Sequence, residues 1–157
     1  MNGLSMMETM KDSISNVLET MFFQPVQISD GNYTLEEWFS QDRSLIGVTL
    51  DFSGPSAGSF YLLIPVKTAN EITANFLGLV EEEINEEQKR DTIKEALNMI
   101  GGGLLSFIDK EGAYRLGIPE LIEGNNFTDN ILADLKGDIL FLETEDGHLA
   151  AGIMMET

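Results

Sequence analysis

The sequence contains no cysteine, one histidine, and only nine lysine or arginine residues against 27 aspartate or glutamate residues. Without cysteine the chain can form neither disulfides nor zinc-thiolate sites, and it has no thiol nucleophile. A single histidine, His148, cannot build a histidine-based metal site or a Ser-His-Asp triad, and we expect it to be an exposed turn residue. The formal charge of −18 disfavours nucleic acid and anionic membranes as partners and leaves proteins or small ligands.

Long apolar runs and a signal peptide are also missing. No stretch approaches the ~20 apolar residues that span a bilayer, and the segment Met1–Met10 lacks a cationic flank followed by an apolar run. We therefore expect a cytoplasmic protein that does not enter the membrane. With 157 residues and 43% hydrophobic content, the chain is expected to form one domain, 1–157, with about residues 1–9 frayed.

Hydrophobic spacing divides the sequence into helices and strands. Apolar residues at helical spacing predict helices. Apolar residues that alternate with polar ones, in short runs bounded by proline or turn residues, predict strands. The predicted helices are 8–23, 67–79 and 86–108, and the predicted strands are 25–29, 45–52, 57–65, 138–145 and 148–156. Asp146-Gly147 indicates a hairpin turn between the last two strands. The segment around Trp38 and Phe39 has no structure assigned to it.

The two halves of the sequence share one order of elements. Each has a helix, a short strand after a proline, and then a two-stranded hairpin, with residues 67–79 as the connector. This order predicts an α+β fold with an antiparallel sheet, helices packed on one face, and two pseudo-repeated αβββ units. Chance similarity is the alternative, because the repeat is one of pattern rather than of sequence identity.

One face of the helix predicted at 86–108 carries a group of polar residues. At ~100° per residue, Asp91, Glu95, Asn98 and Gly102 fall within an arc of roughly 60°. The apolar residues Ile93, Leu97, Ile100 and Leu104 lie opposite. The polar face can therefore meet a partner while the helix is anchored in the core, although an ordinary solvated helix face would look the same.

Three consecutive glycines, Gly101-Gly102-Gly103, follow this polar group. Each glycine costs a helix roughly 1 kcal/mol relative to alanine, so a gain elsewhere must offset them. Gly102 lies beside Glu95 and Asn98, where a missing side chain lets a partner backbone approach. Gly101 and Gly103 would allow close internal packing. The alternative is that the helix simply ends at the glycines.

These residues follow the motif of a known family. Asp91, Glu95 and Asn98 stand at the spacing acidic-x3-Glu-x2-Asn, and Pro119 follows about twenty residues later. In this motif the sequence resembles the CheC/CheX/FliY chemotaxis phosphatases, and most closely the CheX-like domain.

The resemblance implies hydrolysis of the aspartyl phosphate on a CheY-like response-regulator receiver. It implies that Asn98 orients the attacking water and that Glu95 docks on a receiver lysine, with Asp91 and Gly102 as partner-binding positions. It also implies a homodimer, no metal or cofactor bound by this chain itself, and Mg²⁺ on the receiver. Two alternatives stay open: a non-catalytic CheX-like adaptor for a receiver or other signalling protein, and a ligand-sensing or structural domain.

The first helix offers an internal comparison with this motif. Ser15, Glu19 and Phe22 have the same relative spacing as Asp91, Glu95 and Asn98. A phenyl ring cannot orient water, so we expect one catalytic site per chain, as in the CheX type.

Overall fold

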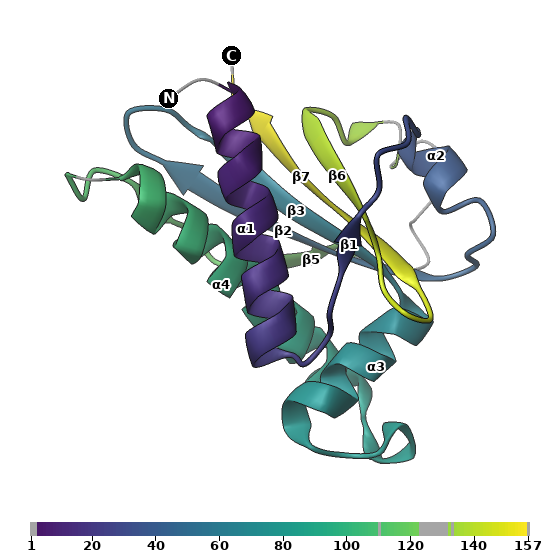
Figure 1. The fold of residues 1–157 in the computed structure, drawn as a ribbon. Coiled ribbons are helices and arrows are strands. Elements are labelled where there is room, and N and C mark those ends of the chain that lie inside the picture. The colour runs from purple at the N-terminus through teal and green to yellow at the C-terminus, as the bar shows by residue number, and fades with distance from the viewer. Residues whose placement is uncertain (1–2, 110, 123–131, 133, 157) are drawn as a thin grey trace.

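The computed structural model describes residues 3–109, 111–122, 132 and 134–156 (Figure 1). Its helices and strands are α1 (Gly3–Met21), β1 (Gln27–Ile28), α2 (Leu35–Trp38), β2 (Leu45–Ser53), β3 (Gly58–Pro65), α3 (Val66–Leu77), the 3-10 turn η1 (Glu81–Glu83), α4 (Glu86–Ile108), β4 (Arg115–Leu116), β5 (Glu120–Ile122), β6 (Asp138–Glu143) and β7 (His148–Met155). The predicted α+β class is confirmed.

The strands form one antiparallel sheet in the order β1-β6-β7-β3-β2, and β2 pairs at its outer edge with both β4 and β5. The first αβββ unit is α1-β1-β2-β3 and the second is α4-β5-β6-β7. The strand order of the sheet is unchanged when each strand is replaced by its counterpart in the other unit. The first strand of each unit pairs with the hairpin of the other unit: β1 with β6, and β5 with β2. The central pairing joins the last strands of the two units, β3 and β7. The pseudo-repeat predicted from the sequence is therefore present in the sheet.

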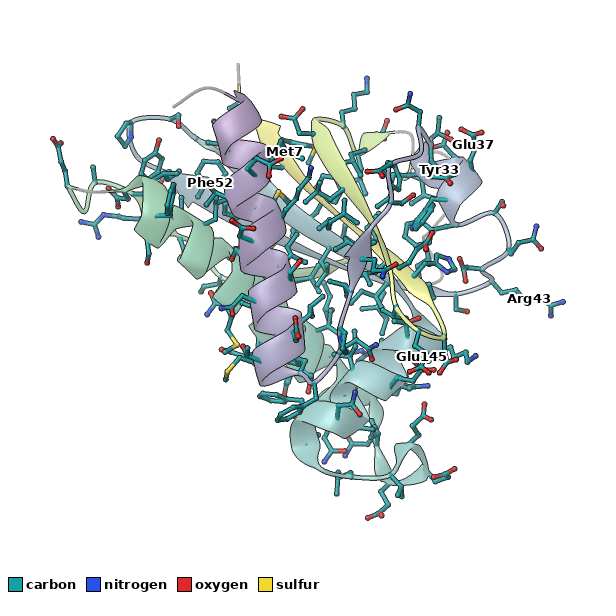
Figure 2. The ribbon with its side chains drawn as sticks, in the orientation of Figure 1. Met7, Tyr33, Glu37, Arg43, Phe52 and Glu145 are labelled. Atoms are coloured by element: carbon teal, nitrogen blue, oxygen red, sulfur yellow. The ribbon has the colours of Figure 1, made fainter. Side chains whose placement is uncertain are left out.

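The sheet has two apolar faces because its strands are buried on both sides. One face packs against the long helices α1 and α4, which lie against each other, and Val48, Leu50, Phe60 and Leu62 belong to this larger core. The residues that alternate with them, such as Tyr61 and Leu63, point to the opposite face. There they meet the one-turn helix α2, which contains the Glu37 labelled in Figure 2.

Two details differ from the sequence predictions. Helix α1 spans Gly3–Met21 rather than the predicted 8–23, and Met6, Met7 and Met10 extend its buried side. Helix α2 is capped at its N-terminus by Thr34, which forms a capping box with Glu37. It was not predicted because one helical turn is too short to show a hydrophobic period. None of the helices that the structure describes is long and apolar enough to cross a membrane.

Candidate functional site

Helix α4 carries the polar face predicted from the sequence. Its observed bounds, Glu86–Ile108, are those predicted from the hydrophobic period. Asn85 caps the N-terminus: its side chain accepts from the Gln88 amide at 2.8 Å, and the Gln88 side chain accepts from the Asn85 amide at 2.9 Å. Ile93 and Leu97 are buried in the larger core, which fixes the rotation of the helix and turns the polar face outward.

The four predicted site residues lie together on this outward face. Asp91 and Glu95 are exposed, and Asn98 and Gly102 are half-buried. Glu95 and Asn98 are one turn apart on the same side of the helix. Within the part of the chain that the structure describes, neither side chain forms a hydrogen bond or an ion pair. An acid and an amide are thus both available to the same external partner.

The glycine run is fully helical, and the three glycines have different surroundings. A Cβ on Gly101 would lie 2.9 Å from Leu50 Cδ2, and one on Gly103 would lie 2.8 Å from Ser13 Oγ. A Cβ on Gly102 would meet nothing nearer than Leu116, at 3.9 Å. Gly101 and Gly103 therefore serve internal packing, against the sheet and against α1. Gly102 instead leaves open surface next to Asn98.

The connection between β4 and β5 borders the same face. Leu116 pairs with Phe52 of β2, and Leu121 pairs with Val48, so Ile118 and Pro119 lie between two paired segments of the sheet edge. Pro119 is half-buried, whereas Ile118 is 83% exposed. Since Leu116 is the nearest neighbour of the position of a Gly102 Cβ, this connection begins beside α4 at the level of Gly102, one turn beyond Asn98. Sequence analysis missed Ile118, because only the strand pairing brings it to the site.

A shallow open hollow lies one helical turn beyond Asn98. It has a volume of about 350 Å³ and is lined by Gly102, Leu105, Ser106, Asp109, Tyr114 and Leu116. The Asp109 carboxylate accepts hydrogen bonds from the backbone amides of Ala113 at 2.7 Å and Tyr114 at 2.9 Å. These bonds hold the turn after α4, and with it the far wall of the hollow, in a fixed position.

Four of the nine basic residues of the chain belong to α4 and β4. Of the nine lysines and arginines, Lys89, Arg90 and Lys94 are on α4 and Arg115 is on β4. Lys89 is buried, and its Nζ lies 2.8 Å from Glu86 Oε1. Lys94 is half-buried beside Glu95, and Arg115 is exposed. Helix α4 also carries Glu86, Glu87, Asp91 and Glu95, so these basic residues offset its negative charge only in part.

Helix α1 does not present an equivalent site. Phe22 is fully buried and stacks on Phe76 with 4.6 Å between the ring centroids. When the buried stripes of the two helices are matched, Ile14 and Leu18 correspond to Ile93 and Leu97. Asn16 and Glu19 then occupy the positions of Glu95 and Asn98, so the acid and the amide are exchanged. A carboxylate thus stands at the position of the catalytic candidate Asn98.

Among the described residues no three His, Asp or Glu side chains are placed to hold a metal ion. The expectation that His148 is an exposed turn residue is wrong. Its ring is half-buried, and its Nε2 lies 2.6 Å from Asp42 Oδ2. His148 also stacks on Phe39 at a centroid distance of 5.7 Å, so it is a structural residue that joins β7 to the loop before β2.

Comparison with known families gives one match. The sequence model of the family described as "Chemotaxis phosphatase CheX" matches residues 46–136, which is more than half of the chain and includes α4 and Pro119. No curated protein matches the sequence at a significant level.

Several solved structures share the fold. The chemotaxis protein CheX from Vibrio vulnificus superposes with a TM-score of 0.75 at 21% identity, over 96% of each chain. A CheC-like superfamily protein from Shewanella sp. PV-4 has a TM-score of 0.72 at 20% identity, over 100% of each chain. The CheX–CheY–BeF3–Mg²⁺ complex from Borrelia burgdorferi gives 0.69 at 16% identity, over 96% of this chain and 97% of that one.

Proposed function

Because the chain belongs to the CheX family of chemotaxis phosphatases, we propose that it hydrolyses the aspartyl phosphate of a CheY-like receiver domain. The observation that carries the proposal is the pair formed by Glu95 and Asn98. The two side chains are one turn apart on a rigid helix, and neither has a partner among the described residues. The solved complex of a related CheX with CheY supports a receiver as the partner.

Asn98 would act by positioning a water molecule. Its amide can donate one hydrogen bond and accept another, but it cannot serve as a base. Phosphoryl transfer has a loose transition state, so in-line placement of the attacking oxygen can supply much of the acceleration. Burial of the Ile93 and Leu97 side chains holds the helix, and therefore the Asn98 amide, in one orientation.

Glu95 would fix the register of the complex by pairing with a lysine of the receiver. A charge-assisted hydrogen bond of this kind strengthens as the interface excludes water. Gly102 would let the receiver backbone approach, since the side chain nearest to the position of its absent Cβ is Leu116, at 3.9 Å. The exposed Ile118 and the hollow beyond Gly102 offer apolar contact beside this polar pair.

The remaining requirements of the reaction would come from the receiver. It would supply the aspartyl phosphate and the Mg²⁺ that neutralises the phosphoryl charge. This chain would contribute no metal and no cofactor. Its Lys94 and Arg115 would reduce the repulsion between two acidic proteins during encounter.

Loss of phosphate from a phosphorylated receiver tests the proposal. The wild-type chain is expected to shorten the lifetime of the aspartyl phosphate, and Asn98→Ala is expected to abolish the acceleration without changing thermal unfolding. Asn16→Ala is the matched control, because it removes an exposed amide from the corresponding face of α1. If the wild-type chain binds the receiver but leaves the phosphate lifetime unchanged, the chain is an adaptor and not a phosphatase.

A homodimer is part of the proposal. Among the described residues, strand β1 ends the sheet and pairs on one side only, with β6. An open edge of this kind can pair with a second copy, which would leave the α4 face free for the receiver. Light scattering coupled to size-exclusion chromatography measures the mass of the particle, which is expected to be that of a dimer. A monomeric mass at all protein concentrations would contradict the homodimer.

A further inference from the structure

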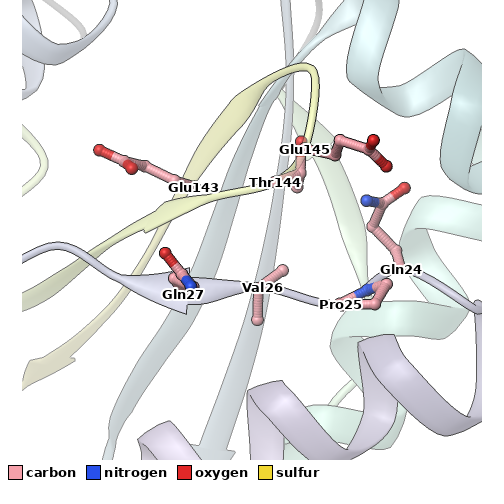
Figure 3. Close-up of a pocket in the computed structure, with 7 residues that line it drawn as sticks. All are labelled: Gln24, Pro25, Val26, Gln27, Glu143, Thr144 and Glu145. Carbon is pink, nitrogen blue, oxygen red and sulfur yellow. The ribbon is translucent and has the colours of Figure 1, made fainter.

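A second pocket lies between the segment that leads into β1 and the end of β6 (Figure 3). Its volume is about 320 Å³. Gln24, Pro25, Val26 and Gln27 form one wall, and Glu143, Thr144 and Glu145 form the other. Neither the proposed phosphatase reaction nor the family motif uses any of these residues.

Gln24 is a buried polar residue whose side chain has no partner. It is only 8% exposed, and among the described residues its side-chain amide forms no hydrogen bond. Figure 3 shows the Gln24 amide and the Glu145 carboxylate pointing toward one another across the pocket. The amide lines the pocket and keeps contact with water there, since the buried side-chain atom that lacks a hydrogen-bond partner in the described part of the chain is Thr144 Oγ1. A bound group can therefore take the place of that water and pair with the amide.

Carboxylates dominate the surroundings of the pocket. Glu143 and Glu145 line it, and the β6–β7 turn that follows lies next to α3 (Figure 2). There the half-buried Glu71 has a pKa above its ordinary value, because burial disfavours its charge. Lys67 lowers this pKa, and Glu81 and Asp146 raise it. The two carboxylates that line the pocket, Glu143 and Glu145, favour a positively charged occupant.

The apolar wall of the pocket indicates that the occupant has a hydrocarbon part as well as a positive charge. Pro25 and Val26 present hydrocarbon next to the Gln24 amide and the Glu145 carboxylate. A methylene chain would pack on the hydrocarbon, while N–H donors at its end would meet the carboxylate and the amide oxygen. The volume of about 320 Å³ is at the lower end of small-ligand sites.

We propose that this pocket binds a guanidinium or primary ammonium group on a short alkyl chain, held by the Glu145 carboxylate and the Gln24 amide. The cation can come from two sources: a free small amine, or an arginine or lysine side chain of a partner protein. The proposal does not depend on the phosphatase reaction, because it uses no residue of α4.

Titration calorimetry and amide NMR on the full chain test the proposal. The probes are propylguanidine, butylamine, the capped peptide acetyl-Ala-Arg-Ala-amide, and Mg²⁺. We expect the organic cations to bind, to shift the side-chain amide signals of Gln24, and to lose affinity about tenfold or more in Glu145→Gln. Glu156→Gln is the matched control, since this exposed carboxylate follows the far end of β7.

A second variant separates ligand binding from folding. Gln24→Met removes the amide but keeps the length of the side chain. If the amide has no partner in the free protein, this variant should be at least as stable as the wild type and should bind the cations about tenfold more weakly.

The two arms of the experiment distinguish the sources. Tighter binding of the peptide than of propylguanidine assigns the pocket to a partner's side chain, and equal binding assigns it to a free amine. The proposal is overturned if no organic cation binds, if Mg²⁺ alone shifts the Gln24 signals, or if Gln24→Met destabilises the chain.

Discussion

Ser13 of α1 donates a hydrogen bond from its Oγ to the backbone carbonyl oxygen of Ile100 in α4, across a distance of 2.9 Å. Gly103 lies against the same hydroxyl, because a Cβ at Gly103 would come within 2.8 Å of it. The two helices are therefore in close contact at the middle of the glycine run. This contact sets the position of the helix that carries Glu95 and Asn98.

Gly102→Ala should stabilise the protein and impair its proposed function. The added methyl has room, with Leu116 at 3.9 Å as its nearest neighbour, and alanine improves helix propensity by roughly 0.5–1 kcal/mol. The same methyl would obstruct the approach of a receiver. Urea unfolding is expected to show the gain, and the phosphatase assay a raised KM for the receiver. Equal activity in the variant would show that Gly102 does not face the partner.

Gly101→Ala should have the opposite effect on stability. Its Cβ would lie 2.9 Å from Leu50 Cδ2 and 3.1 Å from Phe60 Cδ2, inside the core. Overpacking costs about 1–3 kcal/mol, which exceeds the gain in helix propensity of at most roughly 1 kcal/mol. A lower urea midpoint than that of the wild type is the expected result, and an unchanged midpoint would mean that the sheet yields at Leu50.

Glu95→Gln should weaken docking more than turnover. Loss of one charge-assisted hydrogen bond is worth about 1.5–3 kcal/mol, so KM for the receiver is expected to rise about tenfold or more. Rising ionic strength should raise the KM of the wild type more than that of the variant, because salt screens the ion pair. Glu19→Gln, an exposed carboxylate on α1, serves as the control. A fall in kcat without a change in KM would assign Glu95 to the chemistry instead.

The pair of Asp42 and His148 should contribute to folding alone. Their atoms Oδ2 and Nε2 are 2.6 Å apart, and both residues are half-buried. Asp42→Ala is expected to lower the free energy of unfolding by about 1 kcal/mol, and the exposed Asp30→Ala by much less. Phosphatase activity at a temperature well below the transition should not change. A loss of activity in Asp42→Ala would connect this pair to the α4 face.

Glu71 should make stability fall as the pH rises. Burial raises its pKa above the ordinary value of 4.5, so between the unfolded and folded pKa values the folded state binds more protons than the unfolded state. Stability from this residue is then present below the unfolded pKa and is lost as the pH rises through the folded pKa. Glu71→Gln is expected to raise the urea midpoint at pH 7 and to change it little at pH 4. A lower midpoint at pH 7 would show that the ionised carboxylate is stabilising.

The parts of the fold that depend on local pattern could be predicted from the sequence. The helix Glu86–Ile108 was predicted with its observed bounds, because buried residues recur along it and Asn85 caps it. The turn at Asp146-Gly147 was predicted from its residue types alone, and β6 and β7 pair around it. The grouping of Asp91, Glu95, Asn98 and Gly102 on one face follows from helical geometry and needs no tertiary information.

The features that depend on distant contacts could not be predicted in this way. Strand β4 has two residues, too few to show a period, and it forms by pairing with Phe52 and Ser53. The exposure of Ile118 beside α4 follows from that pairing. The pocket of Gln24 and Glu145 joins two segments at opposite ends of the sequence. The capping box of Thr34 and Glu37 was a readable signal that the sequence analysis did not use.

The exchange of strands between the two αβββ units bears on how the chain is made. As the protein leaves the ribosome, β1 emerges early, but its partner β6 is synthesised near the end. The edge of β3 that does not pair with β2 likewise stays unpaired until β7 has been synthesised. The first unit thus has two unpaired strand edges throughout synthesis of α4, so the sheet can close only after the final hairpin is released. A nascent chain that stalls before β6 would present those edges to chaperones or to other stalled copies.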